Sequence, residues 1–260
     1  MRLAVLASGS KANCIYIDGG STSLIVDAGL SVRETLRRLA DAGGDAGKVA
    51  GLLITHEHGD HIRGALPLAR KLEVPLYGTP GTLAAFGTCC KKKDSDLISC
   101  SNGDTFSVGG FTIEPIATSH DAREPCGYLV ADGDTRVCIC TDTGLITPQQ
   151  VAVMRRCNAI VLESNHCPDM LRDGPYPAML KRRIASKYGH LSNTKAAACI
   201  RSVADTTSAL VLAHLSEVNN TAEKAITSAR ESLGFYQDEV DVWAIPGGDH
   251  TPCWSRWVRI

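Results

Sequence analysis

The sequence has little of several features that mark other classes of protein. Only 5% of its 260 residues are aromatic, and 27 Lys and Arg residues balance 28 Asp and Glu residues to a formal net charge of -1. A charge so close to zero excludes a histone-like protein or a polybasic membrane binder. Any polyanionic partner must therefore be held by a local patch of positive charge.

The 11 cysteines lack a recognisable pattern. None is followed by a second cysteine three positions later, so neither a zinc ribbon nor a thioredoxin-type site is expected. Their number is odd, and reduced thiols in a cytoplasmic protein are the simplest interpretation. The first apolar run turns polar at Ser8, too early for a signal peptide, and no run approaches the roughly 18 apolar residues of a membrane helix.

The chain does contain enough apolar sequence for one large core. Hydrophobic residues make up 44% of it, and no linker or repeat interrupts it, so residues 1–260 are expected to form a single domain. Strand-like apolar runs alternate with helical periodicity in both halves. This alternation predicts an α/β (α+β) fold, with helices covering either one sheet on both faces or two sheets packed back to back.

The expected elements can be given by residue number. The expected strands are residues 3–6, 14–17, 23–26, 51–55, 74–77, 111–117, 127–130, 136–141, 159–163, 209–213 and 240–244. The expected helices are residues 31–42, 62–72, 148–157, 177–188, 194–204 and 221–233. The order of the strands within a sheet is left open by the sequence.

The strongest chemical signal is the run Thr-His-Glu-His-Gly-Asp-His at residues 55–61, which follows an apolar strand and precedes a helix. Divalent cations accept imidazole nitrogens and carboxylate oxygens readily. Without cations, so many polar groups would compete for few partners in one turn. His56 and His58 can reach one ion while Asp60 and His61 reach another, so the run predicts a metal site rather than a solvated turn.

Two other residues of this run are expected to have supporting roles. Glu57 is predicted to lie close to the ligands or in solvent without binding a cation. Gly59 is predicted to let the turn bend tightly, because glycine has no side chain to hinder the backbone.

The pattern His-x-His-x-Asp-His after a buried strand resembles the metallo-β-lactamase superfamily. That resemblance implies a four-layer αββα sandwich with a metal site at one edge, and three further ligands at the ends of later strands. These are His120, Asp142 and His214. Each is weak evidence alone, because a histidine after a strand is more often a hydrogen-bonded structural residue. Together they occur in the order that the superfamily requires.

The resemblance therefore implies two divalent cations, zinc or manganese. The first would be bound by His56, His58 and His120. The second would be bound by Asp60, His61 and His214. Asp142 would bridge the two ions. A neighbouring pair of ions can hold a bridging hydroxide as nucleophile and stabilise the leaving oxygen, so hydrolysis is the expected reaction.

Two later residues indicate the class of substrate. Glu163 ends an expected strand and His190 precedes an expected helix, and a Glu and a His at similar places form an auxiliary pair in the ribonuclease Z-like phosphodiesterase branch. A carboxylate beside an imidazole keeps it protonated near neutral pH, and an alkoxide leaving group needs that proton. The expected catalytic residues are thus Asp60, Glu163 and His190.

Motifs along nearly the whole chain are similar to the YycJ/VicX (WalJ) family of bacterial metallohydrolases. They are residues 6–13, 55–61, 120–128, 141–144, 163–166, 189–193 and 214–216. This resemblance implies a 5'-to-3' exonuclease on single-stranded DNA or RNA, with a role in DNA repair. An ester, thioester or lactone hydrolase on the same metals is the alternative, because the superfamily supports many hydrolytic reactions. A non-catalytic binding module is a weaker one, because all seven ligands are present.

The chain is too short to hold the β-CASP insertion of ribonuclease J-type relatives, so a nucleic acid strand would lie across an open face. The residues expected to bind it are Ser10, Lys11, Asn165, Ser192 and Asn193. The last two could equally be a simple helix cap. The basic residues Lys181, Arg182, Arg183 and Lys187 are further candidates, or else a solvated helix face. His166 is expected beside the ligands or at the rim of the site, and His250 in a structural role.

Overall fold

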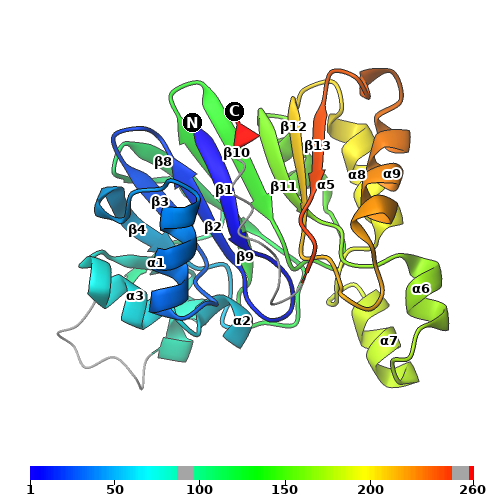
Figure 1. Cartoon of the computed structure of the whole chain (residues 1–260), viewed down its shortest axis with the longest axis horizontal. Coiled ribbons are helices and arrows are strands. Elements are labelled where there is room, and N and C mark those ends of the chain that lie inside the picture. Colours follow the sequence, from blue (N-terminus) through cyan, green and yellow to red (C-terminus); the bar gives the residue numbers. More distant parts are fainter. Residues whose placement is uncertain (87–96, 248–257) are drawn as a thin grey trace.

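The computed structural model describes residues 1–86, 97–247 and 258–260, which form two seven-stranded sheets (Figure 1). His250 lies outside these ranges. In the first sheet the order is β14-β1-β2-β3-β4-β5-β6, with β3 to β6 parallel. Its strands are β1 Arg2–Ala7, β2 Cys14–Asp18, β3 Ser23–Val26, β4 Val49–Leu53, β5 Leu76–Gly78, β6 Leu97–Ser99 and β14 Val258–Arg259.

The second sheet has the order β13-β12-β11-β10-β9-β8-β7. Strands β10 to β13 are parallel, whereas β7 to β10 form an antiparallel meander. Its strands are β7 Phe106–Val108, β8 Phe111–Ala117, β9 Cys126–Asp132, β10 Thr135–Cys140, β11 Ala159–Glu163, β12 Ala209–Ala213 and β13 Asp241–Ala244. The carboxyl ends of the parallel strands in this sheet therefore meet at one edge.

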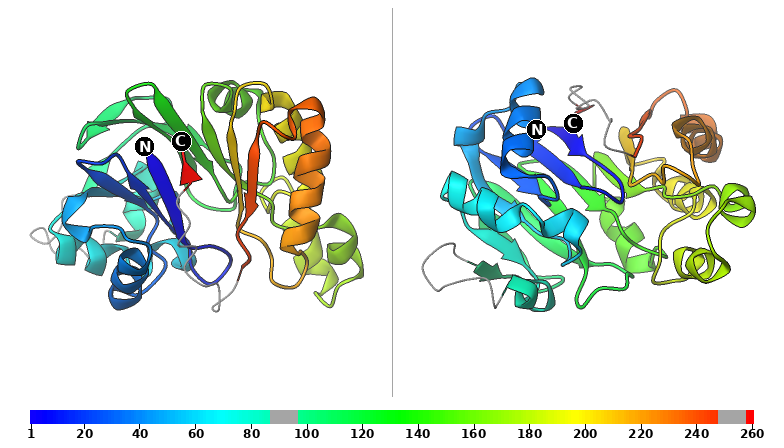
Figure 2. Two further views of the ribbon diagram at one scale, coloured as in Figure 1. Left: turned by 45° about the horizontal axis from the view of Figure 1, so that its top comes forward. Right: turned by 60° about the horizontal axis from the view of Figure 1, so that its bottom comes forward.

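Helices cover the outer face of each sheet, and the two inner faces pack against each other (Figure 2). On the first sheet lie α1 Val32–Asp41 and α3 Ala65–Leu72; on the second lie α5 Pro148–Met154, α8 Asn193–Val203 and α9 Ala222–Leu233. The shorter helices are α2 Gly59–Ile62, α4 Pro80–Leu83, α6 Pro168–Asp173 and α7 Ala178–Ala185, with 3-10 turns at Ala46–Lys48, Ala84–Phe86 and Gly234–Tyr236.

Strand β11 shows why the layers form. Successive side chains of a strand point to opposite faces. Val161 faces the core between the two sheets, whereas Ile160 and Leu162 face the core under the helices. A strand covered on both faces reads as an unbroken apolar run, as β11 and β12 do. The four-layer αββα sandwich expected from the resemblance is confirmed.

The expected helix at residues 62–72 is wrong in its bounds. Helix α2 begins at Gly59, directly after the second histidine of the metal run, and α3 starts again at Ala65. Gly64 separates them, because its amide donates to the carbonyl of Ala28 and a Cβ there would lie 1.9 Å from the carbonyl oxygen of Leu30. The break places the metal run against the loop that follows β3.

Candidate metal centre

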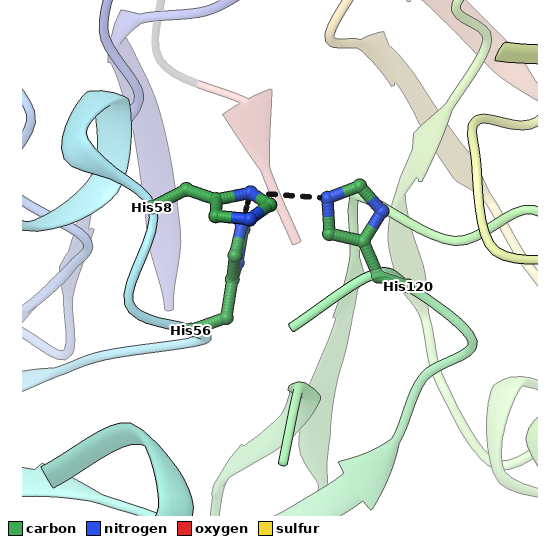
Figure 3. A group of neighbouring side chains, drawn as sticks. All are labelled: His56, His58 and His120. Atoms are coloured by element: carbon green, nitrogen blue, oxygen red, sulfur yellow. Dashed lines mark hydrogen bonds between the residues drawn. The ribbon is translucent and has the colours of Figure 1, made fainter. Parts of the chain in front are cut away.

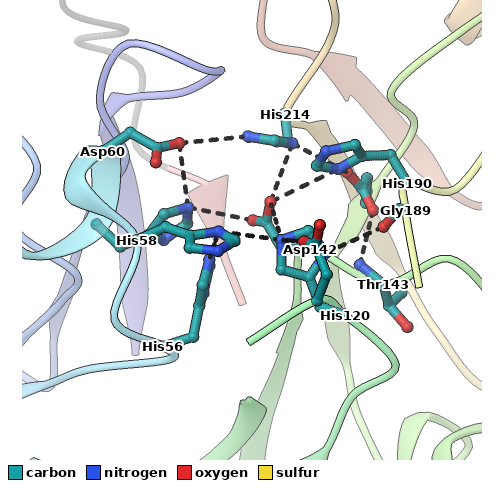
Figure 4. A network of polar contacts seen from close by, with 12 residues as sticks. His56, His58, Asp60, His120, Asp142, Thr143, Gly189, His190 and His214 are labelled. Atoms are coloured by element: carbon teal, nitrogen blue, oxygen red, sulfur yellow. Dashed lines mark hydrogen bonds and ion pairs between the residues drawn. The ribbon is translucent and has the colours of Figure 1, made fainter. Parts of the chain in front are cut away.

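The seven side chains predicted to bind metal lie together at the carboxyl edge of both sheets (Figure 4). Each follows the end of a strand or stands in the loop after it: β4 precedes the metal run, and β8, β10 and β12 precede the other three candidate ligands. Side chains distant in sequence meet here because strand ends at one edge are neighbours in space. The predicted convergence of the seven groups is thus present in the fold.

The three imidazoles predicted to share one ion face one another (Figure 3). The Nε2 atom of His56 lies 3.1 Å from Nδ1 of His58, and Nε2 of His120 lies 3.3 Å from the same atom. The other ring nitrogen of His120 donates to the carbonyl of Gly189, and that of His56 contacts the Thr55 hydroxyl. One nitrogen of each ring is therefore directed at a common point.

The second predicted group consists of Asp60, His61 and His214. One carboxylate oxygen of Asp60 lies 3.5 Å from Nε2 of His61 and 3.9 Å from Nε2 of His214. The amide of Asn13 lies 3.3 Å from the same oxygen, and its backbone N–H donates to the Asp60 carbonyl. The loop after β1 thereby fixes this part of the site.

Asp27 is a residue of the site that the sequence analysis did not single out. Its carboxylate accepts a 2.7 Å hydrogen bond from Nδ1 of His61 and also hydrogen bonds from the backbone N–H and hydroxyl of Thr55. This contact directs the other His61 nitrogen at the cluster. Asp27 directly follows the apolar strand β3, which is the same signal that marked the later candidate ligands.

Asp142 lies between the two groups. One of its oxygens is 3.3 Å from Nε2 of His61, and the other is 3.4 Å from the His214 ring and 3.9 Å from Nε2 of His120. Its Oδ2 atom and Nε2 of His214 are buried without a hydrogen-bond partner among the described residues. Buried polar atoms nearly always have a hydrogen-bond partner. A carboxylate oxygen and an imidazole nitrogen without such a partner, among other imidazoles and carboxylates, are suitable ligands for divalent cations.

Glu163 is buried and contacts two imidazoles and two backbone groups, and it also belongs, with Asp142, His190 and His214, to one of the four candidate metal groups. Its Oε1 accepts hydrogen bonds from Nδ1 of His190 at 2.7 Å and from Nδ1 of His214 at 2.9 Å, and Oε2 accepts from the backbone of Thr143 and Leu191. The expected pairing with His190 is present. The same carboxylate also holds His214, a contact that the sequence did not reveal, so one side chain joins the candidate metal centre to the auxiliary pair.

The two predicted metal groups differ in the pKa values of their histidines. Burial, together with the neighbouring imidazoles, lowers the pKa of His56 well below its usual value. Burial would lower the pKa of His61 too, but the carboxylates of Asp27 and Asp142 raise it well above that value. Against the same effect of burial, Asp142 and the other carboxylates raise the pKa of His214 to about 10. A cation bound by this second group would take the place of a proton on the rings of His61 and His214.

The two carboxyl groups that face these imidazoles are held ionised. Burial acts to raise the pKa of Asp60, but the neighbouring rings of His214 and His61 bring it well below its usual range. In the same way His190 outweighs the effect of burial on Glu163 and lowers the pKa of that carboxyl. Conversely, Glu163 raises the pKa of His190 above that of a free imidazole although burial opposes it.

Three residues of the site adopt a left-handed backbone conformation: Asp27, Asp142 and His214 have φ of 60°, 52° and 55°. Non-glycine residues adopt this conformation rarely, and Asp and His are among those that tolerate it best. Asp27 and His214 come directly after a strand, and Asp142 comes two residues after the end of β10, so all three stand at the edge where the groups meet. Such conformations concentrate at functional sites.

Gly59 does not have the predicted role. It is the first residue of α2, its φ is not positive, and a Cβ added there would meet nothing within 4 Å. The close approach occurs instead at Gly29, where a Cβ would lie 1.8 Å from the backbone oxygen of Asp60. Glu57 accepts a hydrogen bond from the backbone of Arg123, beside the ligands and outside the four candidate metal groups.

A cleft of about 190 Å³ opens beside the candidate metal centre. His190 and His214 line it, together with Ser10, Asn165 and the side of α7 that carries Arg183. Asn165 also donates to the backbone oxygen of His214 at 2.9 Å. Two of the residues predicted to bind substrate are therefore at this cleft.

The other three have contacts within the chain. Lys11 pairs with Glu217 at 3.3 Å. The hydroxyl of Ser192 caps α8, as the alternative interpretation expected, and the amide of Asn193 lies in a buried network with Asn220 and Ser164. These three residues do not line the cleft, so the prediction that they touch substrate gains no support from it.

Comparisons with known proteins agree with this arrangement. A family model described as a beta-lactamase superfamily domain matches residues 22–215. Exodeoxyribonuclease YycJ of Bacillus anthracis is 39% identical over 240 residues, which cover 90% of this chain and 91% of that protein. Exodeoxyribonuclease WalJ of Streptococcus pneumoniae serotype 2 is 36% identical over 228 residues, 86% of this chain and 85% of that protein.

Solved structures show the same fold. The metallo-beta-lactamase fold protein YhfI from Bacillus subtilis superposes with a TM-score of 0.75 over 99% of both chains, at 17% sequence identity. The buried His and Asp clusters, the sandwich and the extent of these matches agree with one another. The chain therefore belongs to the metallo-β-lactamase superfamily and is a metal-dependent hydrolase of that fold.

Proposed function

We propose that this chain is a nuclease that hydrolyses phosphodiester bonds at the end of a single strand of DNA or RNA, in the 5'-to-3' direction. The observation that carries the proposal is the contact between Glu163 and His190, which lies at the wall of the cleft beside the candidate metal centre. The two similar proteins from Bacillus anthracis and Streptococcus pneumoniae are named exodeoxyribonucleases, which favours DNA among the possible substrates.

The chemistry of the pair suits a phosphodiester. The ionised carboxylate of Glu163 keeps the His190 ring protonated, because it raises the pKa of that imidazole. A ring held in this way can give its proton to the oxygen that leaves when a phosphodiester bond breaks. The leaving group of a thioester needs no such proton, so this contact favours a phosphodiesterase over a thioester hydrolase.

The predicted metal residues would hold two divalent ions, zinc or manganese, in the arrangement expected from the resemblance. Such ions, when bound, lower the pKa of a bound water and supply positive charge to the phosphoryl oxygens. The chain itself orients the ligands: Asp27 holds His61, Gly189 holds His120, and Glu163 holds His214. Asp60 contributes to both metal binding and the placement of the reacting groups.

The face around the cleft also suits a polyanion. Arg183 lies at the cleft, and its side chain is exposed. An ion pair with Asp121 at 2.6 Å holds its guanidinium group in place. Because the net charge of the chain is only -1, the phosphates of a strand would depend on local cations of this kind. The strand would bind along the open face beside α7.

The test compares two small substrates and one strand. Metal-loaded protein should hydrolyse bis(p-nitrophenyl) phosphate and an end-labelled single strand, and should turn over an acyl thioester far more slowly. His190→Ala should reduce cleavage of the labelled strand by about a hundredfold or more, the usual contribution of a general acid. Tyr188→Ala, an exposed neighbour outside the cleft, is the matched control. Faster turnover of the thioester than of either phosphodiester would contradict the proposal.

We also infer a cytoplasmic setting. The eight cysteines of the described ranges are all free thiols, and seven of them are buried. A reducing compartment keeps such thiols unpaired. Among the described residues, no helix is both long enough and apolar enough to cross a membrane. A role in DNA repair would follow from an exonuclease activity on DNA ends, as the resemblance implies.

A further inference from the structure

A second pocket, of about 380 Å³, lies on the other side of α7 from the cleft. Its walls are mainly apolar and come from Pro168 and Leu171 of α6 and from Ala178 and Ala185 of α7. Its size is within the range of about 300–1,000 Å³ that is usual for pockets that bind small organic groups. Neither the metal ligands nor the auxiliary pair line it.

Helix α7 separates the two pockets. Leu180, Arg183 and Ile184 line the cleft, whereas Ala178, Lys181, Arg182 and Ala185 line the second pocket. These are two different faces of one helix, because residues three or four positions apart lie on the same side. In Figure 1 this helix stands with α6 at the edge of the molecule, beyond α8.

The chain that follows β11 also contributes to both pockets. Asn165 lines the cleft, and the next residue, His166, lines the second pocket. The His166 side chain is only 3% exposed, and its Nδ1 atom has no hydrogen-bond partner among the described residues. A buried ring nitrogen at a pocket wall is an unused site for a hydrogen bond with a bound group.

Charge at the pocket rim adds a third observation. Arg172 is paired with Asp169 and Asp173, and Lys181 donates to the carbonyl of Arg172. Arg182 is exposed and makes no ion pair or hydrogen bond within the described ranges. The pocket thus combines apolar walls, one buried ring nitrogen without a hydrogen-bond partner, and three cationic side chains, of which Arg182 alone makes no side-chain ion pair or hydrogen bond within the described ranges.

We propose that this second pocket binds a nucleobase of the substrate strand, a few nucleotides away from the one in the cleft, with His166 contacting the base edge and Arg182 the backbone phosphate. The inference rests on the proposed function. An α-helix is about 10 Å across, which two or three nucleotides span at about 3.4 Å or more each. The base that enters the pocket is therefore expected at the second to fourth position from the cleaved nucleotide.

The experiment uses the metal-loaded full chain and single strands of equal length, each with one abasic nucleotide at a different position from the digested end. KM and kcat are measured for each strand, and turnover of bis(p-nitrophenyl) phosphate is measured in parallel. Ala185→Trp fills the pocket from α7. Met179→Trp, on the same helix, 76% exposed and outside both pockets, is the matched control.

One abasic position among the second to fourth should raise KM by at least about fivefold, the lower end expected for a bound base, with kcat little changed. For the Ala185→Trp variant, KM for the intact strand should be raised by the same factor. Removing the base at that position should not raise the KM of this variant any further. Met179→Trp should behave as the unaltered chain. Turnover of the small phosphodiester should be equal in all three proteins.

A flat abasic profile, with the small phosphodiester and the strand both cleaved, would overturn the nucleobase pocket and leave the proposed function standing. That result is also expected if the pocket receives an apolar side chain of a protein partner. Failure to cleave either substrate would overturn both proposals. If Ala185→Trp does not fold, Ala178→Trp fills the pocket from the other end of α7 and is judged by the same criteria.

Discussion

Four imidazoles of the candidate metal centre present one ring nitrogen to the cluster and hold the other against an oxygen of the chain. The partners are the Thr55 hydroxyl for His56, Asp27 for His61, the Gly189 carbonyl for His120 and Glu163 for His214. Such contacts fix the orientation and tautomer of a ligand ring and are nearly as important to metal affinity as the ligands. They explain how a cluster of like groups stays ordered.

The first prediction concerns Asp27. Asp27→Asn should weaken metal binding by about tenfold to a hundredfold, because the ring of His61 loses its carboxylate partner. Competition with a chelator measures the change. Asp134→Asn, in an exposed turn, is the control and should bind metal as the unaltered chain does. Equal affinity in the two variants would show that Asp27 does not orient His61.

The second prediction concerns Glu163. Its carboxylate raises the pKa of His190, so Glu163→Gln should lower that pKa and deprotonate the ring at lower pH. The alkaline limb of kcat/KM should shift to lower pH, and activity at neutral pH should fall by at least about tenfold. A pH profile of nuclease activity measures both effects.

Glu114→Gln, which alters a surface pair with Arg156, is the control for that profile. This variant should leave the acidic and alkaline limbs of the kcat/KM profile unchanged. If Glu163→Gln lowered activity equally at all pH values, the carboxylate would have only a structural role. Metal content, measured on the same samples, separates loss of His214 orientation from loss of the acid.

The candidate ligands could be predicted from the sequence because each is a polar residue within a few positions of the end of an apolar strand. Asp27 carries the same signal, but its role depends on a contact between β3 and the loop after β4. Sequence spacing does not reveal which neighbour a carboxylate will meet. The roles of Ser192 and Asn193 could not be predicted either, because Ser and Asn are common both as helix caps and as residues that bind phosphate.

At the scale of single elements, helix α1 shows how a surface ion-pair network supports the first sheet. Glu34 accepts hydrogen bonds from Arg37 and Arg38, and the buried Arg38 also donates to the backbone of Leu6 in β1. These contacts lower the pKa of Glu34 to about 2. The helix is thereby joined to the strand that precedes the first loop of the site.

The third prediction follows from that pKa. A carboxyl group whose pKa is lower in the folded state stabilises the fold above its unfolded pKa, and the effect is lost as the pH falls through the folded value. Glu34→Gln should reduce the free energy of unfolding by about 1 kcal/mol at pH 7, and by clearly less at pH 2, where the carboxyl group is about half protonated in the folded state. Urea unfolding of the metal-free chain at both pH values is the measurement. A cost that is equal at pH 7 and pH 2 would contradict the assignment.

The segment between β3 and α3 sets the position of the metal run. Gly29 packs against the Asp60 carbonyl, and Gly64 packs against the Leu30 carbonyl, where side chains would not fit. The sequence indicated one helix from residue 62, because helical periodicity is local and does not report a close backbone approach. A glycine within a helical pattern was the available signal for the break.

The fourth prediction uses these glycines. Gly29→Ala should destabilise the chain by about 1–3 kcal/mol, because its Cβ would lie 1.8 Å from a backbone oxygen, and should reduce metal content by displacing Asp60. Gly59→Ala, in the metal run itself, should change stability by less than about 0.5 kcal/mol. Thermal unfolding and metal analysis measure both variants. Equal losses in the two would contradict the packing described.

At the scale of the whole molecule, the pattern of apolar runs left open one sheet or two, the resemblance implied the sandwich, and the strand order could not be predicted. Long apolar runs such as β11 and β12 identified the central strands, because both of their faces are covered. The three-residue strands β6 and β7 were not predicted, because so short a run shows no clear alternation of apolar and polar residues. Order within a sheet depends on contacts between strands far apart in the chain.

The arrangement of the sheets explains why the site lies where it does. Strands β10, β11 and β12 are parallel neighbours, so their carboxyl ends place Asp142, Glu163 and His214 side by side. The metal run and Asp27 reach the same edge from the first sheet. The site is therefore shared by both halves of the sandwich, and its geometry depends on how the two sheets pack.

The most direct test of the account is the number of divalent ions bound per chain, measured by mass spectrometry of metals after dialysis against zinc or manganese. We predict two ions for the unaltered chain and one for the double variant His58→Ala/His120→Ala, which removes two ligands of one predicted ion only. One ion or fewer in the unaltered chain, or two ions in the double variant, would contradict a centre of two ions.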